Sequence, residues 1–280
     1  MLFHAEEKTV RIPGGEVTYV AFGSGEKPLV IIPGLSLRPI HGSALPLAWM
    51  YRLFCPEYRV YVIDKRADVP KGCTIGGLAY DMAETMRAIG IPRAAVVGIS
   101  QGGMIAQYLA VQSPEMVDRL VLGVTLSRTN DTVRAILGKW IEDAAQGDFE
   151  SIVQDMLDKM YSPQYVRKYG RFFPAVLRLV KLDEMERFIR LAESCLTCDI
   201  YERLPEIRCP VLVLGGQEDR IVTARASAEI AEKIGCPVYL YEGLGHSAYE
   251  EAKDFNQRIY DFLRQAPAGP DGRREGNQST

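Results

Sequence analysis

The sequence predicts an α/β protein with a mostly parallel β-sheet that is covered by helices on both faces. Short apolar β-runs alternate with longer helical patterns over most of the chain, as they do in sheets of this class. From about residue 127 to residue 200 the β-runs disappear and amphipathic helical stretches replace them. The alternation then returns, so we expect a helical insertion within one sheet domain.

The first part of the chain supplies the start of the predicted sheet. A Pro13-Gly14-Gly15 turn joins two strands that we expect to pair antiparallel at an edge. The strands are predicted at 8–12, 16–22, 29–32, 59–64, 94–99 and 119–124. Helices are predicted at 44–54, at 75–89 and directly after residue 100, with Gly90 closing the second of them.

The second part contains the insertion and the rest of the sheet. Helical patterns cover 136–145, 149–160 and 185–196, and the later elements are strands at 211–214 and 238–241 and helices at 223–234 and 249–264. Residues 266–280 are rich in Gly, Pro and Arg, and we expect them to be disordered. The predicted organisation is a core of 1–126 and 201–265, a helical cap of 127–200 and the tail 266–280.

Composition excludes several classes of function. The chain has 280 residues, 47% of them hydrophobic, and a net charge of −3, which argues against a nucleic-acid or anionic-membrane partner. We see no secretion signal and no apolar run long enough to cross a membrane. Six scattered cysteines fit a reducing cytoplasm, and the Cys195-Leu196-Thr197-Cys198 motif lacks the second ligand pair of a metal site. We therefore expect a cytoplasmic protein in which this motif holds no metal.

The most informative motif is Gly98-Ile99-Ser100-Gln101-Gly102, which ends a β-run and opens a helix. A serine on so sharp a turn needs very small residues two positions away on each side, and the two glycines supply them. The turn raises the Ser100 hydroxyl above the sheet and directs the backbone N–H of Gln101 toward the group that it attacks. Ser100 is therefore the predicted nucleophile.

A serine nucleophile needs a general base, and the chain has three histidines. His246 follows the last strand, so it should lie at the same edge of the parallel sheet as Ser100. His4 precedes the sheet, and His41 lies in the loop after an earlier strand. The sequence therefore predicts His246 as the base.

The base needs a carboxylate that orients it, and Asp219 follows the strand at 211–214. We prefer Asp219 to Glu218 because neighbours in a turn point apart and the shorter acid fits beside a histidine. Asp131 and Glu218 are the distant alternatives, and the order Ser, Asp, His is the one expected for a strand–turn–helix serine. The second backbone donor for an oxyanion, besides Gln101, is predicted to be the N–H of Leu35, after Pro33-Gly34.

The chain resembles the α/β-hydrolase superfamily, in its capped carboxylesterase and enol-lactonase-like branch. The resemblance rests on the Ser100 motif and on Gly216–Asp219 and Gly245-His246. The resemblance covers roughly residues 8–265. It implies an eight-stranded sheet, a helical cap inserted after the sixth strand and a mechanism without cofactor.

The chain departs from that family at two places. Pro33-Gly34 stands where the family usually has His-Gly, and His41-Gly42 comes too late in the chain to replace it. We therefore interpret His41 as a loop histidine that lines the entrance or packs nearby. Residues 65–70 replace a common Arg-Gly-x-Gly-x-Ser stretch, in a loop that is usually structural.

The predicted function is a serine hydrolase that cleaves carboxylic esters of small to medium, mainly apolar substrates through an acyl-enzyme on Ser100. A small-molecule ester is the expected partner, and a homodimer is compatible with the sequence. A C–C bond hydrolase or lactonase on the same residues, and a non-catalytic ligand-binding member of the fold, are the alternatives.

Substrate choice is expected to depend on the cap. Its apolar residues suggest an apolar pocket, although most of them should pack the cap on the core: Met156, Met160, Tyr161, Phe172, Phe173, Leu177, Met185 and Phe188. Four arginines could meet a substrate carboxylate, but as members of amphipathic helices they are expected to face solvent: Arg167, Arg171, Arg178 and Arg187.

Overall fold

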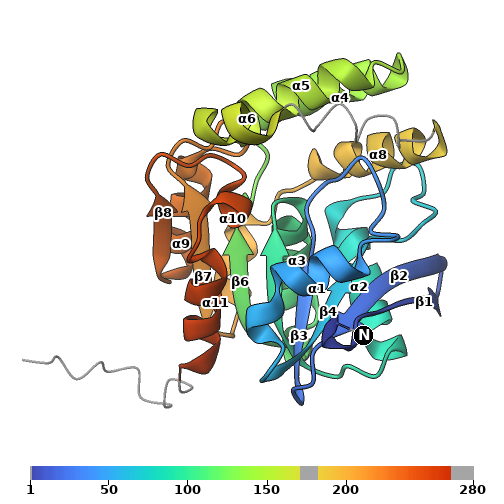
Figure 1. Ribbon diagram of the computed structural model, residues 1–280, viewed down its shortest axis with the longest axis vertical. Coiled ribbons are helices and arrows are strands. Elements are labelled where there is room, and N and C mark those ends of the chain that lie inside the picture. The colour runs from blue at the N-terminus through green and yellow to red at the C-terminus, as the bar shows by residue number, and fades with distance from the viewer. Residues whose placement is uncertain (1, 171–181, 266–280) are drawn as a thin grey trace, which may run out of the picture.

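The computed structural model describes residues 2–170 and 182–265, so the predicted tail at 266–280 lies outside the described residues. Within them an eight-stranded sheet has the order β1-β2-β4-β3-β5-β6-β7-β8 (Figure 1). β2 runs antiparallel to both of its neighbours, and all other adjacent strands are parallel. The predicted fold class and the antiparallel edge are confirmed.

The strands lie close to their predicted positions. They are β1 (Glu6–Ile12), β2 (Gly15–Phe22), β3 (Lys27–Ile32), β4 (Tyr58–Ile63), β5 (Ala94–Ile99), β6 (Val117–Gly123), β7 (Val211–Gly216) and β8 (Val238–Tyr241). The helices that accompany the sheet are α1 (Ala44–Met50), α2 (Ile75–Ala88), α3 (Gln101–Gln112), α9 (Ala224–Ile234), α10 (Ala248–Glu251) and α11 (Phe255–Arg264). Short 3₁₀ turns are η1 (Leu2–His4), η2 (Arg52–Phe54), η3 (Pro114–Met116) and η5 (Tyr201–Glu206).

Both faces of the sheet are buried. Successive side chains of a strand point to opposite faces, and β3 shows the consequence. Val30 packs in the hydrophobic cluster formed with α2, α3 and α9, whereas Leu29 packs in the cluster formed with α1 and α11. Burial on both faces explains why the parallel strands read as continuous apolar runs in the sequence.

Four described helices lie between β6 and β7: α4 (Asp131–Ala145), α5 (Phe149–Met160), α6 (Pro163–Tyr169) and α8 (Leu182–Cys195). We call them the helical insertion. Figure 1 shows the insertion beyond the carboxyl ends of the strands, with α8 below α4 and α5. Phe188 and Leu191 of α8 are fully buried in the cluster that also contains α2 and α3. The insertion therefore shares its core with the sheet domain.

The helix predicted at 249–264 is divided in the structure. α10 ends at Glu251, the backbone is extended at Ala252 (φ −75°, ψ 121°), and α11 begins at Phe255. No Gly or Pro marks the break, and the apolar spacing continues across it, so the pattern alone could not show it. None of the described helices combines the length and apolar character that a bilayer span requires.

Candidate active site

Ser100 occupies a strained turn between β5 and α3. Its φ of 53° and ψ of −118° lie in a region that residues with side chains rarely adopt. A Cβ atom on Gly102 would lie 1.9 Å from the carbonyl oxygen of Ile32, and one on Gly98 would lie 2.4 Å from the carbonyl oxygen of Gly102. Only glycine fits at either position, as the sequence predicted.

Hydrogen bonds hold this strained turn on both sides. The Ser100 N–H donates to the carbonyl oxygen of Gly123 (2.8 Å), and the Thr125 hydroxyl donates to the carbonyl oxygen of Ser100 (2.7 Å). Val124, between these partners, is itself buried with φ at 45°. Such strain persists only where the surroundings impose it, which is common at functional sites.

The structure brings together Ser100, His246 and Asp219, which follow β5, β8 and β7. His246 Nε2 lies 2.9 Å from Ser100 Oγ, and His246 Nδ1 lies 2.8 Å from Asp219 Oδ2. An ionised carboxylate can only accept, so the hydrogen sits on Nδ1 and Nε2 is left to accept the serine hydroxyl. His246 and Asp219 are both buried.

Asp219 is fixed by its own turn. Its Oδ1 accepts the backbone N–H groups of Ile221 (2.8 Å) and Val222 (3.0 Å). Burial of the carboxyl group opposes ionisation, but the interaction with His246 and these two backbone donors outweighs it and lowers the pKa of Asp219. The alternatives Glu218 and Asp131 are both exposed to solvent, and neither hydrogen-bonds His246.

The two predicted oxyanion donors lie beside Ser100. Gln101 is the first residue of α3, so its N–H has no acceptor within the helix. A Cβ atom on Gly34 would lie 3.2 Å from Ser100 Cβ, which places the Gly34–Leu35 peptide against the serine. Pro33-Gly34 thus provides the close approach for which the family usually has His-Gly.

Ser100 and His246 open into a cavity of about 50 Å³. The described residues that line it include no Lys, Arg, Asp or Glu; they are Gly34, Leu35, Ser100, Met104, Val133, Ile136, Leu137, Trp140, Met156, Met160, Cys195, Ile221, Val222, His246 and Tyr249. Of the predicted apolar residues, Met156 and Met160 line the cavity. Tyr161, Met185 and Phe188 do not line it, and Phe172, Phe173 and Leu177 lie outside the described residues.

Sequence reasoning did not single out the four residues that α4 contributes to this cavity. They are Val133, Ile136, Leu137 and Trp140. In the sequence, only their spacing of one or two helical turns could have pointed to them. That spacing shows that the residues share one buried face, but not what the face covers.

The insertion also contacts the loop that carries His246. The N–H of Ser247 donates to the carbonyl oxygen of Met160 (2.8 Å), at the end of α5. The Ser162 N–H donates to Glu251 Oε1 (3.0 Å). The end of α5 and the start of α6 are therefore tied to residues that directly follow His246 in the chain.

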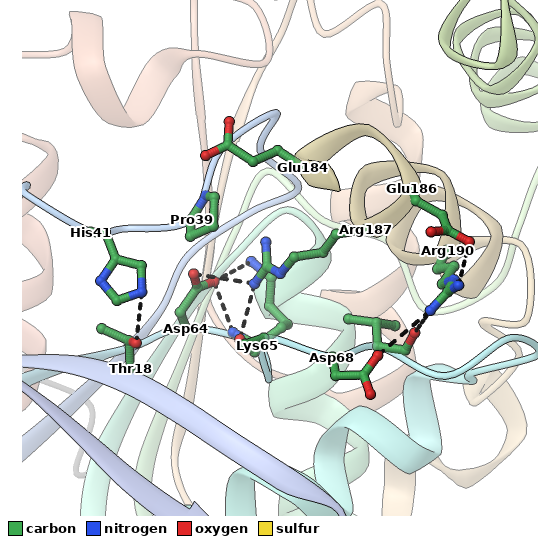
Figure 2. Close-up of a pocket in the computed structure, with 12 residues that line it drawn as sticks. Thr18, Pro39, His41, Asp64, Lys65, Asp68, Glu184, Glu186, Arg187 and Arg190 are labelled. Atoms are coloured by element: carbon green, nitrogen blue, oxygen red, sulfur yellow. Dashed lines mark hydrogen bonds and ion pairs between the residues drawn. The ribbon is translucent and has the colours of Figure 1, made fainter. Parts of the chain in front are cut away.

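Arg187 and His41, which the sequence singled out, do not line the Ser100 cavity. Arg187 does not face solvent as expected: it is 8% exposed and lies 3.2 Å from Asp64, because α8 packs that side of the helix onto the loop after β4. His41 is a loop residue outside the Ser100 cavity, and its Nδ1 lies 2.8 Å from Glu7 Oε1. Its Nε2 lies 3.2 Å from Thr18 Oγ1 (Figure 2).

Arg167 is exposed, and Arg171 and Arg178 lie outside the described residues. All six cysteines are free thiols, and burial raises the pKa of Cys195 to about 12. Over residues 2–170 and 182–265, no group of three or more His, Cys, Asp or Glu side chains could hold a metal ion.

The sequence matches the α/β hydrolase fold family over residues 27–253, so the chain belongs to this family of hydrolases. It is 23% identical to a putative carbamate hydrolase RutD of Rhizobium rhizogenes (85% of this chain, 93% of the relative) and 23% identical to 3-oxoadipate enol-lactonase 2 of Acinetobacter baylyi (92% and 96%). It is 27% identical to a 2-hydroxy-6-oxo-6-phenylhexa-2,4-dienoate hydrolase of Comamonas testosteroni (74% and 72%).

Solved structures show the same fold. The α/β hydrolase MGS-M2 from a Medee basin deep-sea metagenome library superposes with a TM-score of 0.83 at 22% identity, covering 92% of this chain and 98% of its own. A thermophilic esterase from Thermogutta terrifontis gives a TM-score of 0.77 at 21% identity, with 93% and 98% covered. At these identities the likeness establishes the architecture alone.

The turn around Ser100 leads to a prediction about stability. Gly102→Ala should lower the free energy of unfolding by at least about 2 kcal/mol, because its methyl group would collide with the backbone of β3. Gly138→Ala is the matched control: nothing lies within 4 Å of its Cβ position in α4, and it should stabilise the protein by up to about 1 kcal/mol. Urea unfolding followed by circular dichroism measures both, and equal effects would contradict the close approach at Gly102.

The lowered pKa of Asp219 leads to a prediction about acid stability. A carboxyl group with a depressed pKa in the folded state contributes stability above its unfolded pKa of about 3.9, and this is lost as the pH falls through the folded value. Wild type should therefore be more stable than Asp219→Asn above about pH 5, and the difference should shrink toward about pH 2. Urea unfolding across this range measures it.

Asp68→Asn is the control for this experiment, because the Asp68 side chain is 87% exposed. Its stability difference from wild type should stay small at every pH. A difference for Asp219→Asn that persists unchanged to the lowest pH would contradict the proposed ionisation of Asp219.

Proposed function

We propose that this protein is a serine hydrolase that cleaves carboxylic esters through an acyl-enzyme on Ser100. The observation that carries the proposal is the continuous hydrogen-bonded line from Ser100 through His246 to Asp219, at 2.9 and 2.8 Å, on a strained turn that opens into an apolar cavity. Strain at a serine is difficult to explain by stability alone, since it must be offset elsewhere.

In the proposed acylation, Ser100 Oγ attacks the ester carbonyl carbon while His246 Nε2 takes the hydroxyl proton. Asp219 stabilises the imidazolium that forms, and its bonds from Ile221 and Val222 keep the carboxylate in place. The backbone N–H groups of Leu35 and Gln101 bind the oxyanion, and removal of one such donor typically costs about 10²- to 10³-fold in rate. His246 then protonates the departing alcohol.

Deacylation repeats the same steps with water as the nucleophile. His246 removes a proton from water, the hydroxide attacks the acyl carbon, and the tetrahedral intermediate collapses to acid and free serine. The proton returns from His246 to Ser100 Oγ, so the cycle closes without a cofactor.

The cavity favours a short, uncharged acyl group. An apolar cavity of about 150 Å³ can take benzene, so about 50 Å³ suits an acyl chain of about two to four carbon atoms. The described lining offers no cation to a substrate carboxylate. A dienoate or an oxoadipate lactone, named for two of the relatives, bears such a group, which makes C–C and lactone hydrolysis the alternatives and not the first choice.

We also propose that residues 127–200 act as a cap on a core of 1–126 and 201–265. The position of the insertion over the strand ends supports this division, as do the cavity residues that it supplies from α4 and α5. Six free thiols favour a reducing compartment such as the cytoplasm.

Hydrolysis of p-nitrophenyl esters tests the proposed reaction. Wild type should release p-nitrophenol from acetate and butyrate esters faster than from octanoate and laurate, because the cavity is short. Ser100→Ala should lose at least about 10³-fold in kcat/KM. A wild type that turns over none of these esters would overturn the ester assignment. Dienoate and lactone substrates, and then ligand binding without turnover, would be the next to measure.

Trp140 is predicted to limit the acyl chain. It lines the cavity, and its Nε1 donates to Asp155 Oδ2 (2.7 Å) from α4 to α5. Trp140→Leu should raise the octanoate-to-butyrate ratio of kcat/KM by about tenfold, since burial of about two more methylene groups at about 0.8 kcal/mol each corresponds to a factor of this order. Trp140→Phe is the control, because it loses the same hydrogen bond but keeps most of the ring. Equal ratios in both variants would contradict a steric role for Trp140.

A further inference from the structure

Lys65 is a buried cation that the proposed mechanism does not use. Its side chain is 1% exposed, and its ammonium group donates to the carbonyl oxygens of Gly34 (2.7 Å) and Pro33 (3.2 Å). These carbonyls belong to the loop that presents Leu35 to the Ser100 cavity. Lys65 therefore contacts the backbone of this loop directly, although it does not itself line the cavity.

The geometry of one peptide unit connects this contact to the chemistry. In a trans peptide the carbonyl oxygen and the N–H of the next residue point in opposite directions. The carbonyl of Gly34 and the N–H of Leu35 belong to the same peptide unit. Since Lys65 holds the carbonyl, the N–H must point away from Lys65. A reversed peptide would instead present a carbonyl oxygen to the oxyanion.

Lys65 is itself held by a neighbour and by the helical insertion. Asp64 Oδ1 lies 3.5 Å from Lys65 Nζ, and Arg187 of α8 lies 3.2 Å from Asp64 Oδ2 and donates to the carbonyl oxygen of Lys65 (2.9 Å). Figure 2 shows Arg187 reaching from α8 to both residues. Burial lowers the pKa of Lys65, an effect that Asp64 opposes.

The second predicted donor is tied to the same helix. The Gln101 side chain is fully buried, and its Nε2 donates to the carbonyl oxygen of Leu191 (2.7 Å) and to the hydroxyl of Ser194 (3.2 Å), both on α8. Helix α8 thus supports Gln101 directly, and supports Leu35 through Arg187, Asp64 and Lys65.

The buried charges of Asp64, Lys65 and Arg187 are costly, and buried ion pairs are often no more stabilising than apolar residues of the same size. A need to hold the backbone of residues 34 and 35 in one orientation explains these charges better than stability does. We propose that Lys65 is a positioning residue that orients the Gly34–Leu35 peptide, so that docking of α8 sets the oxyanion site from both sides. The proposal rests on the proposed function, because it assigns a role within the same site.

The test compares Lys65→Met, Lys65→Arg and Arg187→Met, with Lys71→Met as an exposed control. On an ester that wild type hydrolyses, Lys65→Met should lower kcat by about 10- to 100-fold and change KM by less than about twofold. Lys65→Arg, which can still donate to the carbonyls, should keep kcat within about tenfold of wild type. Arg187→Met should lower kcat by less than Lys65→Met, and Lys71→Met should match wild type.

Inhibition by butylboronic acid distinguishes a displaced oxyanion donor from a general loss of structural order in the variant. Its tetrahedral adduct with a serine hydroxyl places an oxygen where the oxyanion forms, so its inhibition constant should rise by the same factor as kcat/KM falls. Wild-type kcat and inhibitor affinity in Lys65→Met would overturn the proposal, as would a loss confined to KM. If Lys65→Met does not fold, wild-type kcat and inhibitor affinity in Arg187→Met would overturn it.

Failure of the proposed function is distinguishable from failure of this inference. If wild type hydrolyses no ester, the ester assignment fails, and the rate at which a fluorophosphonate labels Ser100 becomes the readout. Slower labelling of Lys65→Met than of wild type and Lys71→Met would support the positioning role. Equal rates would overturn it.

Discussion

The contact between the turn at Ser100 and the end of β3 constrains the rest of the site. Gly102 packs so closely on the carbonyl of Ile32 that no side chain fits between them, and Gly34 lies against Ser100 itself. The strained serine and the loop that carries Gly34 and Leu35 therefore lie in direct contact. In the proposed reaction, backbone donors prearranged in this way would need no reorganisation when charge develops on the substrate, which is where most of the effect of such donors originates.

The helical insertion supports this arrangement as well as covering it. α8 hydrogen-bonds the Gln101 side chain and, through Arg187, the Asp64–Lys65 pair, while the end of α5 binds the loop beside His246. The side chains of α4 and α5 that line the cavity are apolar. These polar contacts of the insertion thus go to residues around the Ser100 cavity, and apolar side chains of α4 and α5 line the cavity itself.

The sequence carried local information well. Apolar runs, glycine spacing and strand order were enough to predict the sheet, the turn at Ser100 and the juxtaposition of His246 with Asp219, because a parallel sheet brings the carboxyl ends of its strands to one edge. The prediction of one continuous helix at 249–264 was wrong, because no helix-breaking residue marks the break between α10 and α11. The prediction that Arg187 faces solvent was wrong for a different reason: its burial depends on Asp64, which lies far away in the chain.

By itself, therefore, the sequence determined the fold class and which residues meet at the strand ends, since both follow from periodicity and topology. Only the tertiary structure decided the small uncharged cavity, because its walls come from separate helices whose facing sides no periodicity specifies. It also decided the contacts of residues 64 and 65, which the sequence placed at the end of a predicted strand and at the start of the loop after it. Their contacts with Gly34 and Arg187 join segments 31 to 123 residues apart, and such contacts are set by packing and not by local pattern.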